Sequence, residues 1–122
     1  MNTNITYITD VVFVTCIVNR GSGEKVIALA REVGVSGEII YNARGSGIRE
    51  RLGLWGIAIE AEKDVVTMVT STHNRDLLIH HLYTSLGLDR AGAGVVYAIP
   101  LNKVAAYMPE DLLKNLKEGV VQ

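Results

Sequence analysis

Two glycine-containing stretches carry the residue types that could hold an anion. The first, Arg44-Gly45-Ser46-Gly47, follows a run at residues 38–41 that is typical of a strand. Glycine lacks a Cβ atom, so its backbone can adopt positive φ and approach a ligand closely, and successive N–H groups can then converge on an anion. Arg44 adds a fixed positive charge at the mouth of this turn. The alternative is a hairpin tip with a solvated arginine, because short glycine motifs occur in many turns.

The second stretch is Ala91-Gly92-Ala93-Gly94, which follows Arg90 and precedes an apolar run at residues 95–99. Each loop alone is typical of a plain turn. Facing each other across a subunit boundary, their backbone donors together with Arg44 and Arg90 would suit phosphate oxygens. Within one subunit we expect the last strand to lie beside the second at the sheet edge, an arrangement that does not force the two loops together.

Other polar motifs predict no catalytic or metal site. The turn at residues 19–25 contains two glycines one residue apart, where the Walker A motif has four residues between them, so we expect a helix cap there. His80 and His81 are adjacent and would point to different sides of a helix, and His73 precedes that helix, so they predict no chelating set. Neither a nucleophile with a nearby base nor a pair of carboxylates is indicated by spacing, and we predict that the protein is not an enzyme.

The composition indicates one globular domain. The chain has 122 residues, of which 48% are hydrophobic and 20% charged, which is enough to build a core and argues against disorder. The net charge of −1 provides no electrostatic footprint for nucleic acid or an anionic membrane.

Apolar runs fall far short of the roughly 20 residues that a membrane-spanning helix needs. The N-terminus resembles no signal peptide, and the single Cys16 lies in an apolar stretch, so we expect an inert thiol and a cytoplasmic location.

The hydrophobic pattern predicts the order strand, helix, strand, strand, helix, strand. Core strands are expected at residues 11–18, 37–44, 65–70 and 95–99, and helices from Ser22 or Gly23 to Gly34, from Arg75 with Asn74 as its cap to Leu86, and from Pro109 to Gly119. A returning strand is expected at 55–60, with an interruption or bulge at Glu62-Lys63-Asp64 before the third core strand. This order is the α+β, ferredoxin-like βαββαβ sandwich, with a long loop between strands 2 and 3 and a short C-terminal helix.

Three segments follow from this assignment. Residues 1–9 are an N-terminal arm, either loose or an added edge strand. Residues 10–107 form the ferredoxin-like domain, and residues 108–122 form the C-terminal helix and tail.

The core strands are almost continuously apolar, which indicates that both faces of the sheet are covered. Two helices can cover only one face of the sheet. The other face would then expose an apolar patch larger than monomeric proteins usually tolerate. We therefore predict that the sheets of several copies pack together; the alternative is that the arm or the tail folds over the open face.

The chain resembles the PII signal-transduction superfamily, specifically the PII-like nitrogen regulators. The resemblance covers residues from about 10 to 107. It rests on the order of elements and on three motifs, at residues 17–21, 43–47 and 91–97, the last followed by Pro100 and Lys103. It implies a homotrimer that binds an adenine nucleotide in the clefts between subunits. It also implies that a mobile T-loop regulates a partner protein, such as a membrane transporter or a metabolic enzyme.

The resemblance also implies which residues would act. The T-loop would begin with Arg44, Gly45, Ser46 and Gly47, and the B-loop would contain Gly92, Ala93 and Gly94, with Arg90 and Lys103 as helpers at the phosphates. Residues 48–54 would be the tip of the T-loop. Its partner-binding residues would be Ile48, Arg49, Glu50, Arg51 and Leu52.

Several positions depart from the pattern of the family. Val95 stands where typical PII proteins have a phosphate-binding lysine. The pair of arginines that those proteins carry on the C-terminal loop is also missing, and only Lys103 lies near. Residues 48–49 replace the T-loop glutamine that helps hold a metal, and the loop contains no tyrosine before Trp55 that could be uridylylated. The effector therefore stays open among AMP, ADP, ATP, a cyclic nucleotide or another small anion. A small enzyme on the same fold and a metal-responsive CutA-like trimer are the other candidate classes.

Overall fold

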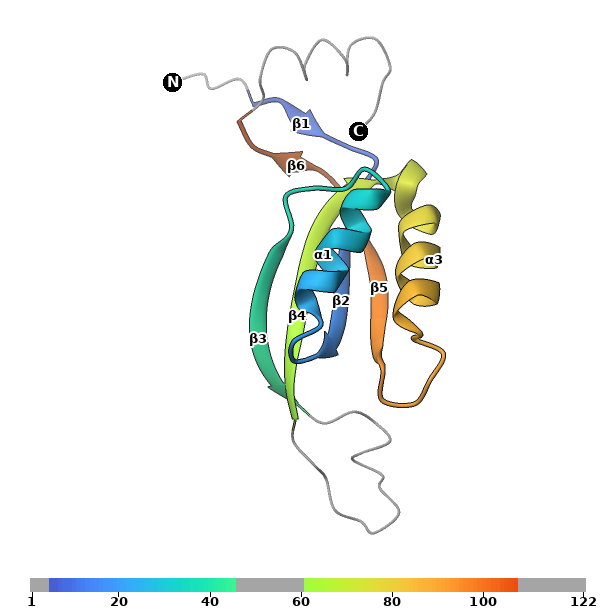
Figure 1. Ribbon diagram of the computed structural model, residues 1–122. Coiled ribbons are helices and arrows are strands. Elements are labelled where there is room, and N and C mark those ends of the chain that lie inside the picture. Colours follow the sequence, from blue (N-terminus) through green and yellow to red (C-terminus); the bar gives the residue numbers. More distant parts are fainter. Residues whose placement is uncertain (1–4, 46–60, 108–122) are drawn as a thin grey trace.

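The computed structural model describes residues 5–45 and 61–107 (Figure 1). These residues form six strands, two α-helices and one 3-10 turn. In chain order they are β1 (Tyr7–Ile8), β2 (Val11–Asn19), α1 (Gly23–Glu32), β3 (Ile39–Gly45), β4 (Ala61–Ser71), η1 (Thr72–Asn74), α3 (Arg75–Leu86), β5 (Gly94–Leu101) and β6 (Val104–Ala105). The expected C-terminal helix and the expected strand at 55–60 lie outside the described residues. In the described part of the chain, no helix combines the length and apolarity that a membrane span requires.

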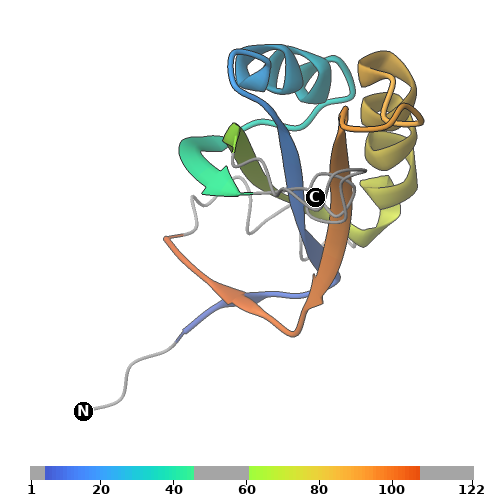
Figure 2. The same cartoon turned by 90° about the horizontal axis from the view of Figure 1, so that it is seen from below.

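The main sheet has four antiparallel strands in the order β3-β4-β2-β5. Helices α1 and α3 lie side by side on one face of it, as the view from below shows (Figure 2). This order and layering confirm the ferredoxin-like prediction. The expectation that the last strand, β5, lies beside the strand expected at 37–44, which is β3, is wrong. β3 and β5 are the two opposite edges, because β4 and β2 occupy the centre of the sheet.

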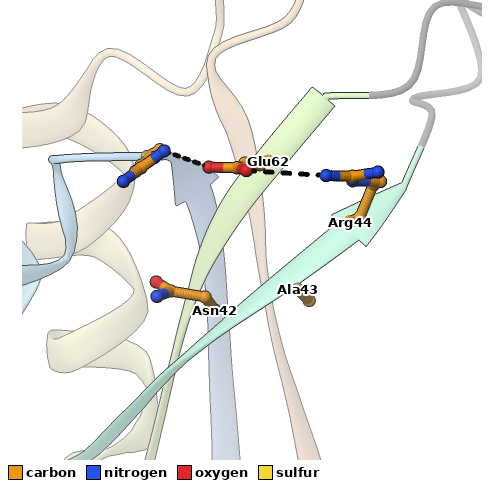
Figure 3. A pocket seen from close by; sticks show the side chains of 5 residues that line it. Asn42, Ala43, Arg44 and Glu62 are labelled. Carbon is orange, nitrogen blue, oxygen red and sulfur yellow. Dashed lines mark hydrogen bonds and ion pairs between the residues drawn. The ribbon is translucent and has the colours of Figure 1, made fainter.

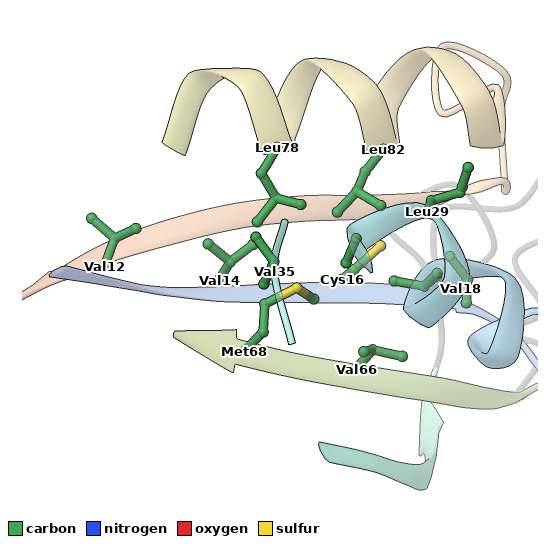
Figure 4. Close-up of a cluster of buried hydrophobic side chains, with 12 residues drawn as sticks. Val12, Val14, Cys16, Val18, Leu29, Val35, Val66, Met68, Leu78 and Leu82 are labelled. Carbon is green, nitrogen blue, oxygen red and sulfur yellow. The ribbon is translucent and has the colours of Figure 1, made fainter. Parts of the chain in front are cut away.

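The covered face holds the hydrophobic core (Figure 4). Side chains alternate across a strand, so every second residue of β2 points toward the helices. The core members on the four-stranded sheet and on α3 are Val12, Val14, Cys16, Val18, Val66, Met68, Leu78 and Leu82. Burial raises the pKa of the Cys16 thiol to about 12, so the side chain is un-ionised at neutral pH. The prediction of a buried, unreactive cysteine agrees with this environment.

β4 continues without a break through residues 62–64, and the predicted interruption there is wrong. Glu62, Lys63 and Asp64 pair in register with Arg44, Ala43 and Asn42 of β3. Strand pairing uses backbone groups, so charged side chains do not prevent it when they find solvent or partners at the end of a sheet. The charges that suggested a bulge therefore belong to a regular strand.

The helix boundaries agree with the predicted signals, although the caps differ in detail. Gly87 has φ of 64° and ends α3 in the left-handed conformation, as predicted. Asn74 stands at the N-cap position of α3, but its side chain makes no capping bond. The Asn74 N–H instead donates to Ser71 Oγ at 3.2 Å, which starts the preceding 3-10 turn.

The face opposite the helices is also apolar. Its large hydrophobic side chains are between 42% and 64% exposed; they are Ile39, Tyr41, Val69, Val95, Tyr97 and Ile99.

Tyr7–Ile8 of the N-terminal arm pairs with β6 in a separate two-stranded ribbon beyond the end of the main sheet, so it is not an added edge strand (Figure 1). Those six side chains stay exposed beside it. Burial of this face by other copies of the chain stays a prediction.

Candidate functional site

An open pocket of about 320 Å³ lies where β3 ends and β4 begins (Figure 3). Its lining residues are Arg20, Asn42, Ala43, Arg44 and Glu62. The antiparallel register places Arg44 directly opposite Glu62, and the turn after β2 brings Arg20 to the same place. The pocket therefore stands at the base of the segment 46–60, which joins the two strands.

The pocket lies on the helix side of the sheet. Ile40 is on that side, because its Cδ1 atom would be 2.3 Å from a Cβ atom added to Gly23 of α1. Residues two positions apart on a strand share a face, so Arg44 lies on the same side as Ile40. Glu62 pairs with Arg44 and shares that face.

Glu62 pairs with both arginines of the pocket. Its Oε2 atom accepts from Arg20 Nη1, and its Oε1 atom lies 3.6 Å from Arg44 Nη2. The side chains of Arg20, Arg44 and Glu62 are 69%, 67% and 42% exposed. Two of the lining residues are cationic and one is anionic, so the lining carries an excess of positive charge. Guanidinium groups bind phosphate and carboxylate oxygens through paired hydrogen bonds, which makes a small anion the natural ligand of this pocket.

A second carboxylate closes the start of α1. Asp64, 6% exposed, accepts hydrogen bonds at Oδ2 from the Gly21 N–H at 2.9 Å and the Gly23 N–H at 3.0 Å. Ser22 occupies the N-cap position as predicted, but its side chain makes no capping bond. The carboxylate of β4 supplies that cap from more than forty residues away, so this helix start already holds a negative charge.

The second glycine loop is tied to the same end of the sheet. Asn19 Nδ2 donates to the Gly92 carbonyl at 3.2 Å, and Lys63 Nζ donates to Asn19 Oδ1 at 2.9 Å. Asn19 therefore links the loop at 92–94 with the start of β4. At Gly94, φ is 139° and an added Cβ atom would lie 2.3 Å from the Ile17 carbonyl oxygen. A side chain at this position would disturb the β2–β5 pairing whether or not a ligand is bound.

The other predicted site residues lie apart from the pocket. Arg90 donates from Nε to the Gly87 carbonyl at 3.2 Å and from Nη2 to the Leu86 carbonyl at 3.4 Å, so it caps the end of α3. Lys103 Nζ lies 4.4 Å from the centre of the Tyr7 ring, at the opposite end of β5 from Gly94. Gly45 ends β3. Ser46, Gly47, Ile48, Arg49, Glu50, Arg51 and Leu52 lie outside the described residues.

The histidines do not gather into a metal site within the described ranges. His81 Nε2 of α3 lies 2.8 Å from Oε1 of Glu32, the last residue of α1. Across residues 5–45 and 61–107, no group of three or more histidine, cysteine or carboxylate side chains could hold a metal ion. Arg20 and Glu62 line the pocket although neither is among the predicted site residues. A continuous β4 through 62–64 would have kept Glu62 on a strand, but its position opposite Arg44 depends on the register of β3 against β4.

Comparison with known proteins supports the architecture. No protein-family model and no curated protein sequence matches the chain. Among solved structures, Arabidopsis thaliana PII bound to citrate is similar with a TM-score of 0.60 and 14% identity, over 77% of this chain and 79% of that one. The B. subtilis GlnK–ATP complex is similar with a TM-score of 0.60 and 16% identity, over 75% of this chain and 81% of that one. The chain therefore has the fold of PII proteins, as the resemblance implied.

Proposed function

We propose that this chain is a PII-like, non-enzymatic regulatory protein that binds an adenine nucleotide or a similar small anionic effector. The observation that carries the proposal is the arginine-lined pocket at the base of residues 46–60. Arg44 stands on the strand that enters this segment and Glu62 on the strand that leaves it. One protein of the same fold is in complex with ATP and another with citrate, and both molecules are small polyanions.

The effector would be held by charge and by main-chain groups. Arg44 binds an oxyanion of the effector, and the backbone around Gly92 and Gly94 contributes N–H donors. In its own subunit, Lys103 lies at the far end of β5 from Gly94. Any contact of Lys103 with the effector is therefore made across a subunit boundary, in a neighbouring copy.

The assembly that we propose is a homotrimer. The apolar face opposite the helices supports it, because side chains such as Tyr97 and Ile99 are exposed to water in the single chain. Burying this face between copies creates clefts at subunit boundaries. Light scattering should then report three times the 13.3 kDa mass of the chain. A particle of single-chain mass would remove the clefts and this part of the proposal.

Binding is tested by calorimetric titration and thermal shift with ATP, ADP, AMP, cyclic AMP and citrate. A ligand at about a hundred times its dissociation constant should stabilise the fold by about 2.7 kcal/mol. Arg44→Ala should weaken binding by about 10-fold to 150-fold, because a hydrogen bond to a charged group contributes about 1.5–3 kcal/mol. Arg44 is a cleaner probe than Gly94, where a side chain would disturb strand pairing directly.

Arg75→Ala is the matched control for this experiment. Arg75 pairs with Asp76 at the start of α3, away from the pocket, and its removal changes the net charge by the same amount. Equal affinities in the Arg44→Ala and Arg75→Ala variants would refute the site. Absence of binding by every one of the five ligands would refute the effector class.

Signal output would pass through the tip of the 46–60 segment to a partner protein in the cytoplasm, with a transporter or a metabolic enzyme as the proposed partner. Exchanging residues 48–52 for a glycine–serine stretch should abolish partner capture and leave effector affinity unchanged. Loss of both properties would place the effector contacts in the tip and contradict this division of roles.

A further inference from the structure

The Glu62 carboxylate lies between two guanidinium groups from different parts of the chain (Figure 3). One of its oxygens pairs with Arg20 in the turn after β2, and the other lies 3.6 Å from Arg44 Nη2 at the end of β3. A phosphate or carboxylate group of an effector would engage these guanidiniums through the same kind of oxygen contacts. Glu62 therefore occupies the position in which an oxyanion would be held.

The contacts of Glu62 are of a kind that exchanges readily. The side chains of Arg20 and Arg44 are more than two-thirds exposed, and that of Glu62 is 42% exposed. Ion pairs in such surroundings are weak, because water and salt screen them and both partners lose side-chain freedom. The polyanionic effector of the proposed function carries several oxyanion groups and can compete with a single carboxylate.

We infer that Glu62 is an internal competitor for the oxyanion of the effector, and that Arg20 is the second arginine of this subsite. The inference rests on the proposed function. An anionic group of the effector enters by taking the places of the two Glu62 oxygens at Arg20 and Arg44. No covalent bond forms or breaks in this exchange, and the Glu62 carboxylate turns to water.

The exchange also changes the charge pairing beside the 46–60 segment. Arg44 and Glu62 are cross-strand partners at the ends of β3 and β4. When the effector is bound, the partner of Arg44 is the ligand, and a free negative charge is left on β4. Occupancy of the pocket is thereby converted into a change of ion pairing at the two positions that flank the segment.

The test is calorimetric titration at low ionic strength with ATP, citrate and inorganic phosphate as probes. Glu62→Gln removes the competing charge and should tighten ATP binding by about threefold to tenfold, the size expected from the loss of exposed ion pairs. Arg20→Ala should weaken it by about tenfold or more. In the double variant, Glu62→Gln should tighten binding less than it does alone, because one of the two contested arginines is gone.

Glu32→Gln is the control, because Glu32 is an exposed carboxylate on α1 paired with His81 and its neutralisation changes the net charge equally. Equal tightening in both glutamine variants would indicate a net-charge effect only, and weaker binding in Glu62→Gln would make Glu62 a ligand contact. Either result overturns the inference and leaves the proposed function in place. If the wild-type protein binds neither these probes nor ADP, AMP or cyclic AMP, the proposed function fails. Binding by Glu62→Gln alone would then still support the competition, and no binding by that variant would overturn it.

Discussion

Asp64 and Glu62 are carboxylates two residues apart on the same face of β4, and their surroundings differ in every respect that matters. Asp64 is 6% exposed and accepts from two backbone N–H groups that cannot move away without unfolding the start of α1. Glu62 is 42% exposed in its side chain and pairs with the ends of two arginine side chains. Burial and the type of partner, rather than the acid itself, therefore decide whether a carboxylate is structural or exchangeable.

Removal of the buried carboxylate is expected to have the largest effect. Asp64→Ala should lower the free energy of unfolding by about 3 kcal/mol, because two N–H groups at a buried helix start lose a charged acceptor. Denaturant unfolding measures this change. Asp64→Asn keeps an oxygen acceptor and should cost about 1 kcal/mol. A loss below about 0.5 kcal/mol for Asp64→Ala would place Asp64 in the same class as an exposed surface carboxylate.

Glu38 is a third carboxylate. It is buried like Asp64 but, in the described part of the chain, lacks the backbone donors that Asp64 has. Its side chain is 1% exposed, and Arg31 Nε lies 3.8 Å from its Oε1 atom. Among the described residues, both of its oxygens lack a hydrogen-bond partner. The free-energy cost of desolvating a buried charge without hydrogen bonds exceeds the stabilisation from a distant ion pair. Glu38→Met should therefore raise the free energy of unfolding by about 1 kcal/mol. A decrease of that size would mean that the carboxylate has a stabilising partner.

The smallest effect is expected at Glu62. In the absence of an effector, Glu62→Gln should change the free energy of unfolding by less than about 1 kcal/mol, and the difference should shrink as salt is raised toward 1 M. The loss in Asp64→Asn should persist in the same salt series, since burial protects it from screening. Parallel salt curves for the two variants would contradict the distinction between a structural and an exchangeable carboxylate.

Much of the fold could be predicted from local patterns. The apolar run at 11–18 and the helical spacing from Arg75 to Leu86 correspond to β2 and α3, and the order of elements identified the ferredoxin-like topology. These assignments succeed because side-chain periodicity and glycine stops are properties of neighbouring residues. The apolar character of both sheet faces followed from the same strands.

The candidate site could be predicted only in part. The sequence singled out Arg44 from its position between a strand and a glycine pair. It did not associate Arg44 with Arg20 or Glu62. Arg44 meets Glu62 only through the register of β3 against β4, and Arg20 reaches Glu62 only through the register of β2 against β4. The charges at 62–64 predicted an interruption of the strand, so Glu62 was not predicted as a site residue, although β4 is regular there.

Residue types and short-range spacing are enough to predict the helices, most of the strands and the anionic chemistry expected near Arg44. The cap that Asp64 provides for α1 and the link that Glu62 makes between Arg20 and Arg44 depend on the tertiary structure. These partners lie roughly twenty to forty residues apart in the chain. Contacts of that kind form only after the strands have aligned, and a shift of one residue would turn both carboxylates to the other face of the sheet.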